Sequence, residues 1–216
     1  WNSADQQFIY YNTNYKGTFL GAKYDELLTY QYPSVEFSLN NDVTWTEPNI
    51  RDTHHDLIQL PWGDYLGIGH EYQNGPIHAI GYIQMLYFAN GYLADGATNE
   101  WPWQGDVLII WDQHTGEEKW TWRAFDHFNT LDYDINSWNA PPNFSEPAYD
   151  WTHINAITYN ENDNCIYFSS RNLDRITKIQ IQYDEIIDEI SGGNIIWNMG
   201  YNSPSGDVTF GHNLGF

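Results

Sequence analysis

The sequence predicts an all-β protein, and three observations support this class. Aromatic side chains make up 18% of the 216 residues, and aromatic residues are enriched on pleated strands. Short apolar runs alternate with turns rich in Gly, Pro, Asn and Asp, which is typical of hairpins. No stretch of ten or more residues has the apolar periodicity of a convincing amphipathic helix.

Four strand–turn–strand units follow one another along the chain. The paired runs are residues 55–60 with 65–68, 106–111 with 118–122, 153–159 with 165–170, and 176–182 with 194–198. Turn-forming residues separate the runs, as expected for hairpins. The best short helix candidate is 183–190, the segment 77–86 fits a helix or a strand, and 128–150 is predicted to be a long connecting loop.

The recurrence of these units favours a β-propeller over a sandwich or a barrel. A Trp-bearing strand follows a strand–turn–strand unit more than once, and propeller blades repeat about every 40–50 residues. We therefore expect residues 1–216 to form a single propeller domain, or a propeller fragment of about three to four blades. The one cysteine, Cys165, excludes an internal disulfide and a multi-cysteine zinc site.

The strongly negative net charge argues against a nucleic-acid partner. There are 29 acidic and 8 Lys or Arg residues, giving a formal charge of −21. Binding to a phosphate backbone requires many basic side chains, so we expect no nucleic-acid partner. No run approaches the 18 or more apolar residues of a membrane helix, so we expect no membrane span.

A group of polar side chains is expected around residue 153. Alternate side chains on a strand share a face, so His153 and Asn155 should point the same way. A turn centred on Asn162 places Arg171 across the ladder from His153, with Cβ atoms roughly 5 Å apart. The imidazole, the carboxamide and the guanidinium then converge as hydrogen-bond donors, which suits a tetrahedral oxyanion such as sulfate or phosphate.

A histidine-rich segment supplies further candidates. A turn centred at 62–63 places His55 opposite His70 and directs His54 to the other face of the sheet, beside Glu71. Histidine can transfer protons or act as a nucleophile. A metal-dependent hydrolase built on His55, His70 and Glu71 is a competing hypothesis. Because adjacent strand residues diverge, His54 and His55 are poorly placed to bind one ion together.

Several of these segments, in order, resemble the family of aryl sulfotransferases that work without phosphoadenosine phosphosulfate. The run DWTHIN at 150–155, followed by SSR at 169–171, resembles the family's H-x-N…S-S/A-R signature. HDL…LPWGDYL at 55–66 resembles its H-D-x…L-P-N-G-N-x-L unit. The segments at 115–127 and 193–197 resemble its T-G-x…W…D-H and G-x-I-x-W elements.

The resemblance implies a six-bladed propeller that acts in a secreted, periplasmic or cell-surface location. It implies sulfuryl transfer from a phenolic sulfate to a phenol through a transiently sulfated histidine, with no cofactor and no metal. The small aromatic sulfate and phenol are the implied partners, and self-assembly or partner chains are left open. The catalytic candidates are His55, His153 and Arg171, and the substrate-binding candidates are Asn155, His54 and His70.

One family element does not match. The family's nucleophilic histidine follows a glutamine downstream of the G-x-I-x-W strand, whereas His212, the only later histidine, follows a glycine. The expected Gln-His pair falls just past Phe216, so the nucleophile either lies beyond this sequence or has been lost. The alternative function is therefore a non-catalytic extracellular propeller, a structural, filament or binding module that retains an oxyanion pocket.

Overall fold

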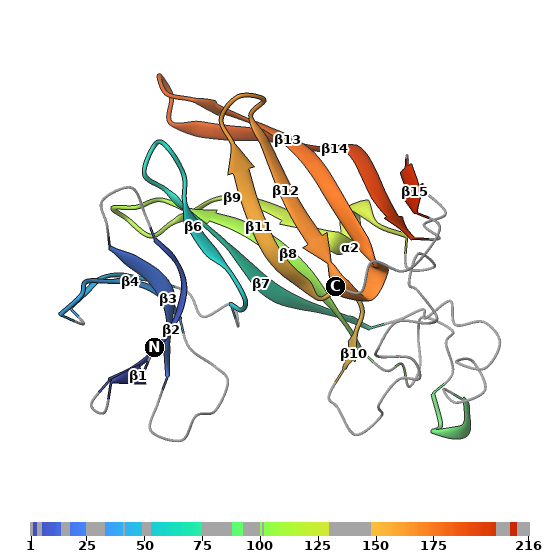
Figure 1. Ribbon diagram of the computed structural model, residues 1–216. Coiled ribbons are helices and arrows are strands. Elements are labelled where there is room, and N and C mark those ends of the chain that lie inside the picture. Colours follow the sequence, from blue (N-terminus) through green and yellow to red (C-terminus); the bar gives the residue numbers. More distant parts are fainter. Residues whose placement is uncertain are drawn as a thin grey trace.

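The computed structural model confirms the all-β class. It describes residues 2–3, 6–13, 18–24, 33–40, 42–48, 53–74, 88–92, 100, 102–129, 148–201 and 208–210. Three five-stranded sheets contain all of the described strands. In Figure 1 the N-terminal sheet lies to one side, and the other two sheets lie against each other. The described ranges contain no helix with the length and hydropathy needed to cross a membrane.

The N-terminal sheet, sheet A, is an antiparallel meander in which sequential strands are neighbours. Its strands are β1 (Asn2–Ser3), β2 (Gln6–Thr13), β3 (Phe19–Tyr24), β4 (Ser34–Phe37) and β5 (Val43–Thr46). Leu20 and Trp45 from this sheet pack with Trp111 of the next sheet. Sheet A is therefore joined to the rest of the molecule by an apolar contact.

The second sheet, sheet B, provides half of the central core. Its strands are β6 (Leu57–Gln59), β7 (Tyr65–Asn74), β8 (Pro102–Trp111), β9 (Glu118–Arg123) and β10 (Tyr149–Asp150). Strands β6 to β9 form an antiparallel meander, and β10 adds to β8 in parallel. The short helix α2 (Ala124–His127) follows β9.

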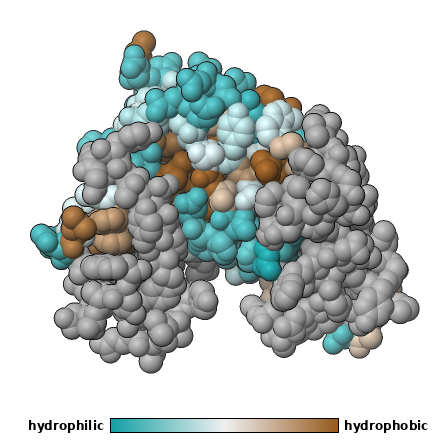
Figure 2. Space-filling view, in the orientation of Figure 1, coloured by the Kyte–Doolittle hydropathy of each residue, from teal (hydrophilic) through white to brown (hydrophobic). Residues whose placement is uncertain are grey.

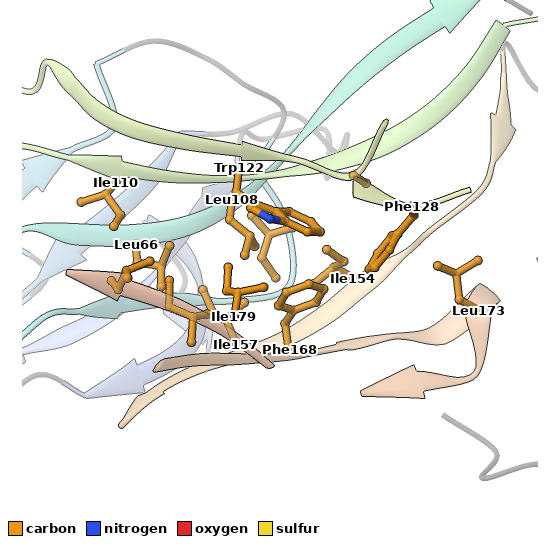
Figure 3. Packing of buried hydrophobic residues seen from close by; sticks show 14 of the residues in the cluster. Leu66, Leu108, Ile110, Trp122, Phe128, Ile154, Ile157, Phe168, Leu173 and Ile179 are labelled. Carbon is orange, nitrogen blue, oxygen red and sulfur yellow. The ribbon is translucent and has the colours of Figure 1, made fainter. Parts of the chain in front are cut away.

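The third sheet, sheet C, packs on sheet B. It contains β11 (Ile154–Asn160), β12 (Cys165–Ser170), β13 (Arg175–Asp184), β14 (Glu189–Tyr201) and β15 (Val208–Phe210), with a 3-10 turn η2 (Arg171–Leu173) after β12. Its first four strands are an antiparallel meander. Figure 3 shows the core between the two sheets, where Leu108 and Trp122 face Phe168 and Ile179.

The four predicted hairpins are confirmed, but the predicted helix at 183–190 is wrong. Residues 183–190 form no helix, because Tyr183 pairs with Ile190 across the β13–β14 hairpin. The turn is closed by Asp188, whose φ of 56° is left-handed. Figure 2 shows a hydrophilic surface over this end of β13 and β14 with a hydrophobic tip, where Ile186 is 89% exposed. Segment 77–86 and most of 128–150 lie outside the described residues.

Candidate active site

Four histidines from three separate segments form one cluster between sheets B and C. The ring centroids of His54 and His70 lie 3.9 Å apart, and those of His55 and His153 lie 5.0 Å apart. The rings of His54 and His55 are 4.9 Å apart and link the two pairs. The structure thus brings together four of the six residues predicted for the site.

A row of three side chains crosses sheet B. His70 on β7 pairs directly with Asp106 on β8, and the amide of His54 donates to the carbonyl of Ile68 at 3.0 Å. Nε2 of His54 lies 3.0 Å from Oδ1 of Asp106, and Nε2 of His70 lies 3.6 Å from the same oxygen. Asp106 is 1% exposed, so this carboxylate is a buried anion shared by two imidazoles.

The predicted register of this hairpin is wrong by one residue. Leu57 pairs with Gly67 and Ile58 with Leu66, so the turn is centred on Trp62 and His54, not His55, lies opposite His70. His54 therefore does not face the other side of the sheet beside Glu71. Instead, Glu71 binds Arg123, with Oε2 at 2.6 Å from the guanidinium.

A left-handed residue allows two adjacent histidines to converge. His55 has a φ of 61°, a conformation that non-glycine residues adopt rarely and often at functional sites. Nδ1 of His55 consequently lies 2.8 Å from Nδ1 of His54. The expectation that neighbouring side chains diverge fails here because the segment leaves the extended conformation at His55.

Hydrogen bonding orders the protons along this chain of groups. In neutral His54, Nε2 carries the proton that is donated to Asp106, so Nδ1 is an acceptor. The proton between the two Nδ1 atoms then belongs to His55, and Nε2 of His55 carries a lone pair. Asp106, His54 and His55 together present one basic nitrogen.

His153 lies where the chain crosses from sheet B to sheet C. Its φ is 48°, and its Nδ1 lies 2.5 Å from Oδ2 of Asp150 on β10. This contact keeps a proton on Nδ1 and leaves Nε2 for a ligand. Asp106 holds the same crossing, because its Oδ2 accepts hydrogen bonds from the Thr152 hydroxyl at 2.5 Å and from the Ile154 amide at 2.6 Å.

Arg171 lies opposite His153, as the sequence predicts. The amide of Arg171 donates to the carbonyl of His153 at 3.0 Å. A bulge between Ile154 and Ala156 shifts the ladder by one residue and produces this pairing. Within the described part of the chain, the half-buried guanidinium of Arg171 forms no hydrogen bond or ion pair.

Asn155 is the residue at this bulge. Its Oδ1 accepts a hydrogen bond from the Ser169 hydroxyl at 2.6 Å. Among the described contacts, none joins Asn155 to a histidine of the cluster. The structure therefore places Asn155 beside the site with its carbonyl oxygen already bonded.

The electrostatics divide the histidines into two kinds. Burial, with the neighbouring His54 next in importance, lowers the pKa of both His55 and His70 to about 4. Burial alone would also lower the pKa of His153, but the hydrogen bond and charge of Asp150 outweigh it and raise that pKa. At neutral pH the site thus presents neutral His55 beside a readily protonated His153.

Asp106 remains ionised although it is buried. Burial alone would raise its pKa, but hydrogen bonding and charge from His54, with the charge of His70, lower the pKa to about 2.

His54, His70 and Asp106 have ligand atoms within 4.8 Å of one another. However, the stacked rings of His54 and His70 lie only 23° from parallel, so their in-plane lone pairs do not converge on one ion.

Comparison with known proteins identifies the family of the chain. The family model described as Arylsulfotransferase (ASST) matches residues 84–204, more than half of the chain. The chain belongs to the arylsulfotransferase family. No individual curated protein matches the sequence. The matched range includes Asp106, Asp150, His153 and Arg171, and phenols and their sulfate esters are the substrates that the family implies.

Sequence reasoning did not assign Asp106 or Asp150 to the candidate site. Asp106 is separated by 46 residues from Thr152, and Asp150 belongs to a two-residue strand. The available signals were the charged residue at 106, which begins the predicted apolar run 106–111, and the position of Asp150 in the DWTHIN segment. The sequence's single Gln-His pair, at 113–114, lies at the turn end of sheet B, where Gln113 donates to the carbonyl of Trp62.

Proposed function

We propose that the chain transfers a sulfuryl group from a phenolic sulfate ester to a phenolic acceptor. The observation that carries this proposal is the pairing of His153 with Arg171, beside neutral His55. A guanidinium and an imidazolium can bind the oxygens of a sulfate ester, and both donors become more effective as charge spreads over those oxygens in a loose transition state.

Each group has a distinct role in this reaction. As the S–O bond to the donor breaks, protonated His153 gives its Nε2 proton to the departing phenolate. Nε2 of His55 takes the proton of the acceptor phenol, whose oxygen forms the new bond to sulfur. Asp106 orients His54 and His70, His54 in turn contacts His55, and Asn155 borders the sulfate.

We further propose that the three meanders are blades of a β-propeller of the six-bladed type, with these histidines facing its axis. The four-stranded antiparallel meanders β2–β5, β6–β9 and β11–β14 support this architecture. A secreted, periplasmic or cell-surface location is the accompanying proposal, based on the resemblance and on the acidic composition.

The test is release of nitrophenol from 4-nitrophenyl sulfate in the presence of an added phenol. We expect His153→Ala and Arg171→Ala to lower kcat/KM by at least about 100-fold. The matched controls are His114→Ala, in the exposed β8–β9 turn, and Arg123→Ala, which removes an exposed guanidinium outside the cluster.

Two outcomes would contradict the proposal. Unchanged turnover in His153→Ala and Arg171→Ala would show that this cluster is not the site. Sulfate binding with no turnover on any phenol would favour the non-catalytic propeller. Mass spectrometry of protein quenched during turnover shows whether a histidine carries the sulfuryl group, as the resemblance implies.

A further inference from the structure

A cavity lies at the other end of the strands that carry the histidine cluster. It has a volume of about 660 Å³ and is lined by the β6–β7 turn, the β11–β12 hairpin and strands β13 and β14. His153 precedes β11, whereas the cavity is bordered by the turn that follows β11. Because β11 has seven residues, the two sites are separated by roughly 20 Å.

Aromatic side chains from three strands or turns form one wall of this cavity. The rings of Trp62 and Tyr183 are stacked with centroids 4.5 Å apart and planes 9° from parallel. Tyr159 meets Trp62 edge to face at 5.5 Å. All three residues line the cavity. The stacked rings of Trp62 and Tyr183 cover one face of each other, and the Lys119 ammonium lies 5.4 Å from the centroid of the Tyr183 ring. A ligand would therefore meet the remaining faces and edges of these rings at a junction of sheets B and C.

Hydrogen bonds fix each of these rings in place. Trp62 Nε1 donates to Asp64, the Tyr159 hydroxyl to Asn164, and the Tyr183 hydroxyl to Asp188, each at 3.0 Å. A ligand would therefore meet rings that are already ordered. Such preorganisation lowers the entropic cost of binding.

Exposed carboxamides occupy the neighbouring strands. Gln180 and Asn194 face each other across the β13–β14 ladder, and Gln182 lies two residues further along β13. None of the three side chains bonds to another described residue. A carboxamide donates and accepts hydrogen bonds at once, which matches hydroxyl groups better than it matches ions.

The charges around the cavity disfavour an anion. Among its described lining residues, Glu161 is charged and there is no lysine or arginine. The nearby ammonium of Lys119 is held by Asp64 and Asp188, and that of Lys178 by Asp163 at 2.9 Å. An anionic ligand such as an aryl sulfate would thus find no unpaired cation here.

We propose that this cavity binds a neutral oligosaccharide. The aromatic wall would cover the apolar C–H face of a sugar ring, while Gln180, Gln182, Asn194 and Glu161 bond to its hydroxyls. The site is distinct from the proposed sulfuryl-transfer site and does not depend on it. It would attach the protein to a glycan surface and leave the histidine cluster accessible.

The experiment is isothermal titration calorimetry of the full chain with four neutral probes and one anionic probe. The neutral probes are cellohexaose, maltohexaose, xylohexaose and mannohexaose, and the anionic probe is a chondroitin sulfate hexasaccharide. We expect at least one neutral probe to bind and the anionic probe to bind at least tenfold more weakly. The double variant Gln180→Ala/Gln182→Ala should weaken neutral binding at least tenfold.

The controls separate this proposal from loss of folding and from the transferase. Gln180 and Gln182 are exposed, so their variants should retain the thermal melting temperature and any 4-nitrophenyl sulfate turnover. Gln73→Ala, an exposed amide on β7, should bind the sugar as the wild type does. Failure of every neutral probe to bind, equal binding by the double variant, or preference for the sulfated probe would each overturn the proposal.

Discussion

Asp106 and Thr152 are joined by two hydrogen bonds. The Asp106 amide donates to Thr152 Oγ1 at 2.9 Å, and the Thr152 hydroxyl donates back to the Asp106 carboxylate at 2.5 Å. The carboxylate also accepts from the Ile154 amide, so it holds the chain on both sides of His153. A buried anion of sheet B therefore stabilises the left-handed conformation of a candidate catalytic residue that precedes sheet C.

Asp106→Asn should reduce activity more than it reduces stability. One amide oxygen can still accept from Thr152 and Ile154, but the NH₂ group would then face His54 and reverse the proton order of His54 and His55. We expect kcat to fall at least about 100-fold, as when the carboxylate partner of a catalytic histidine is replaced by an amide. ¹⁵N NMR of the imidazoles, together with turnover, measures this. An unchanged tautomer of His55 would contradict the proton order inferred for Asp106, His54 and His55.

Asp150→Asn should move the alkaline limit of substrate binding to lower pH. Asp150 raises the pKa of His153, and binding of the sulfate ester requires protonated His153, so binding is lost as the pH rises through that pKa. Removing the charge should shift this loss to lower pH. The pH dependence of KM for 4-nitrophenyl sulfate reports the shift. Asp126→Asn, which changes an exposed carboxylate, should leave the profile unchanged.

His70 should make the protein less stable in acid. The pKa of His70 is lowered from 6.5 to about 4 in the folded protein. The stability that neutral His70 contributes to the fold is therefore fully present above pH 6.5 and is lost as the pH falls towards 4. The loss should be about 2 kcal/mol in the free energy of unfolding. Urea denaturation at pH 7 and pH 4.5 should therefore show a smaller difference for His70→Gln than for the wild type. An equal difference in both proteins would contradict this assignment; His114→Gln is the exposed control.

Trp122 should be the most sensitive contact between sheets B and C. Its side chain is 1% exposed, meets Phe168 edge to face at 5.1 Å, and donates from Nε1 to the carbonyl of Gly193 at 3.0 Å. Trp122→Ala should lower the free energy of unfolding by about 3–5 kcal/mol, as measured by chemical denaturation. Trp120→Ala, at a more exposed position of the same strand, should cost clearly less. Equal losses would show that Trp122 is not a central core contact.

The strands were predictable because their signals are local. Turn residues and apolar runs identified the four hairpins, and the structure pairs them accordingly. The proposed helix at 183–190 was wrong because hairpin pairing outweighed a short apolar spacing. The turn there uses left-handed Asp188, a conformation that the sequence does not specify uniquely.

The pairing of His153 with Arg171 was predicted correctly because an error in the position of the turn was offset by a bulge in the strand. The β11–β12 hairpin, which follows His153, has its turn half a residue away from the predicted centre, and the bulge at Asn155 restores the pairing of His153 with Arg171. No bulge corrected the hairpin of His54, so its predicted partner was wrong. The contacts of Asp106 join residues far apart in the chain, and hydrophobic periodicity carries no information about such contacts.

The two carboxylate–amide links between sheets B and C also have a mechanical consequence. Asp56, just before β6, accepts from the Ile157 amide at 3.0 Å, and Asp106 accepts from the Ile154 amide. Sliding one sheet along the other by a single residue would break both links together and remove one hydrogen-bond donor from each carboxylate. The two sheets should therefore resist shear as one rigid block, and a substrate must enter past the surrounding loops without forcing the layers apart.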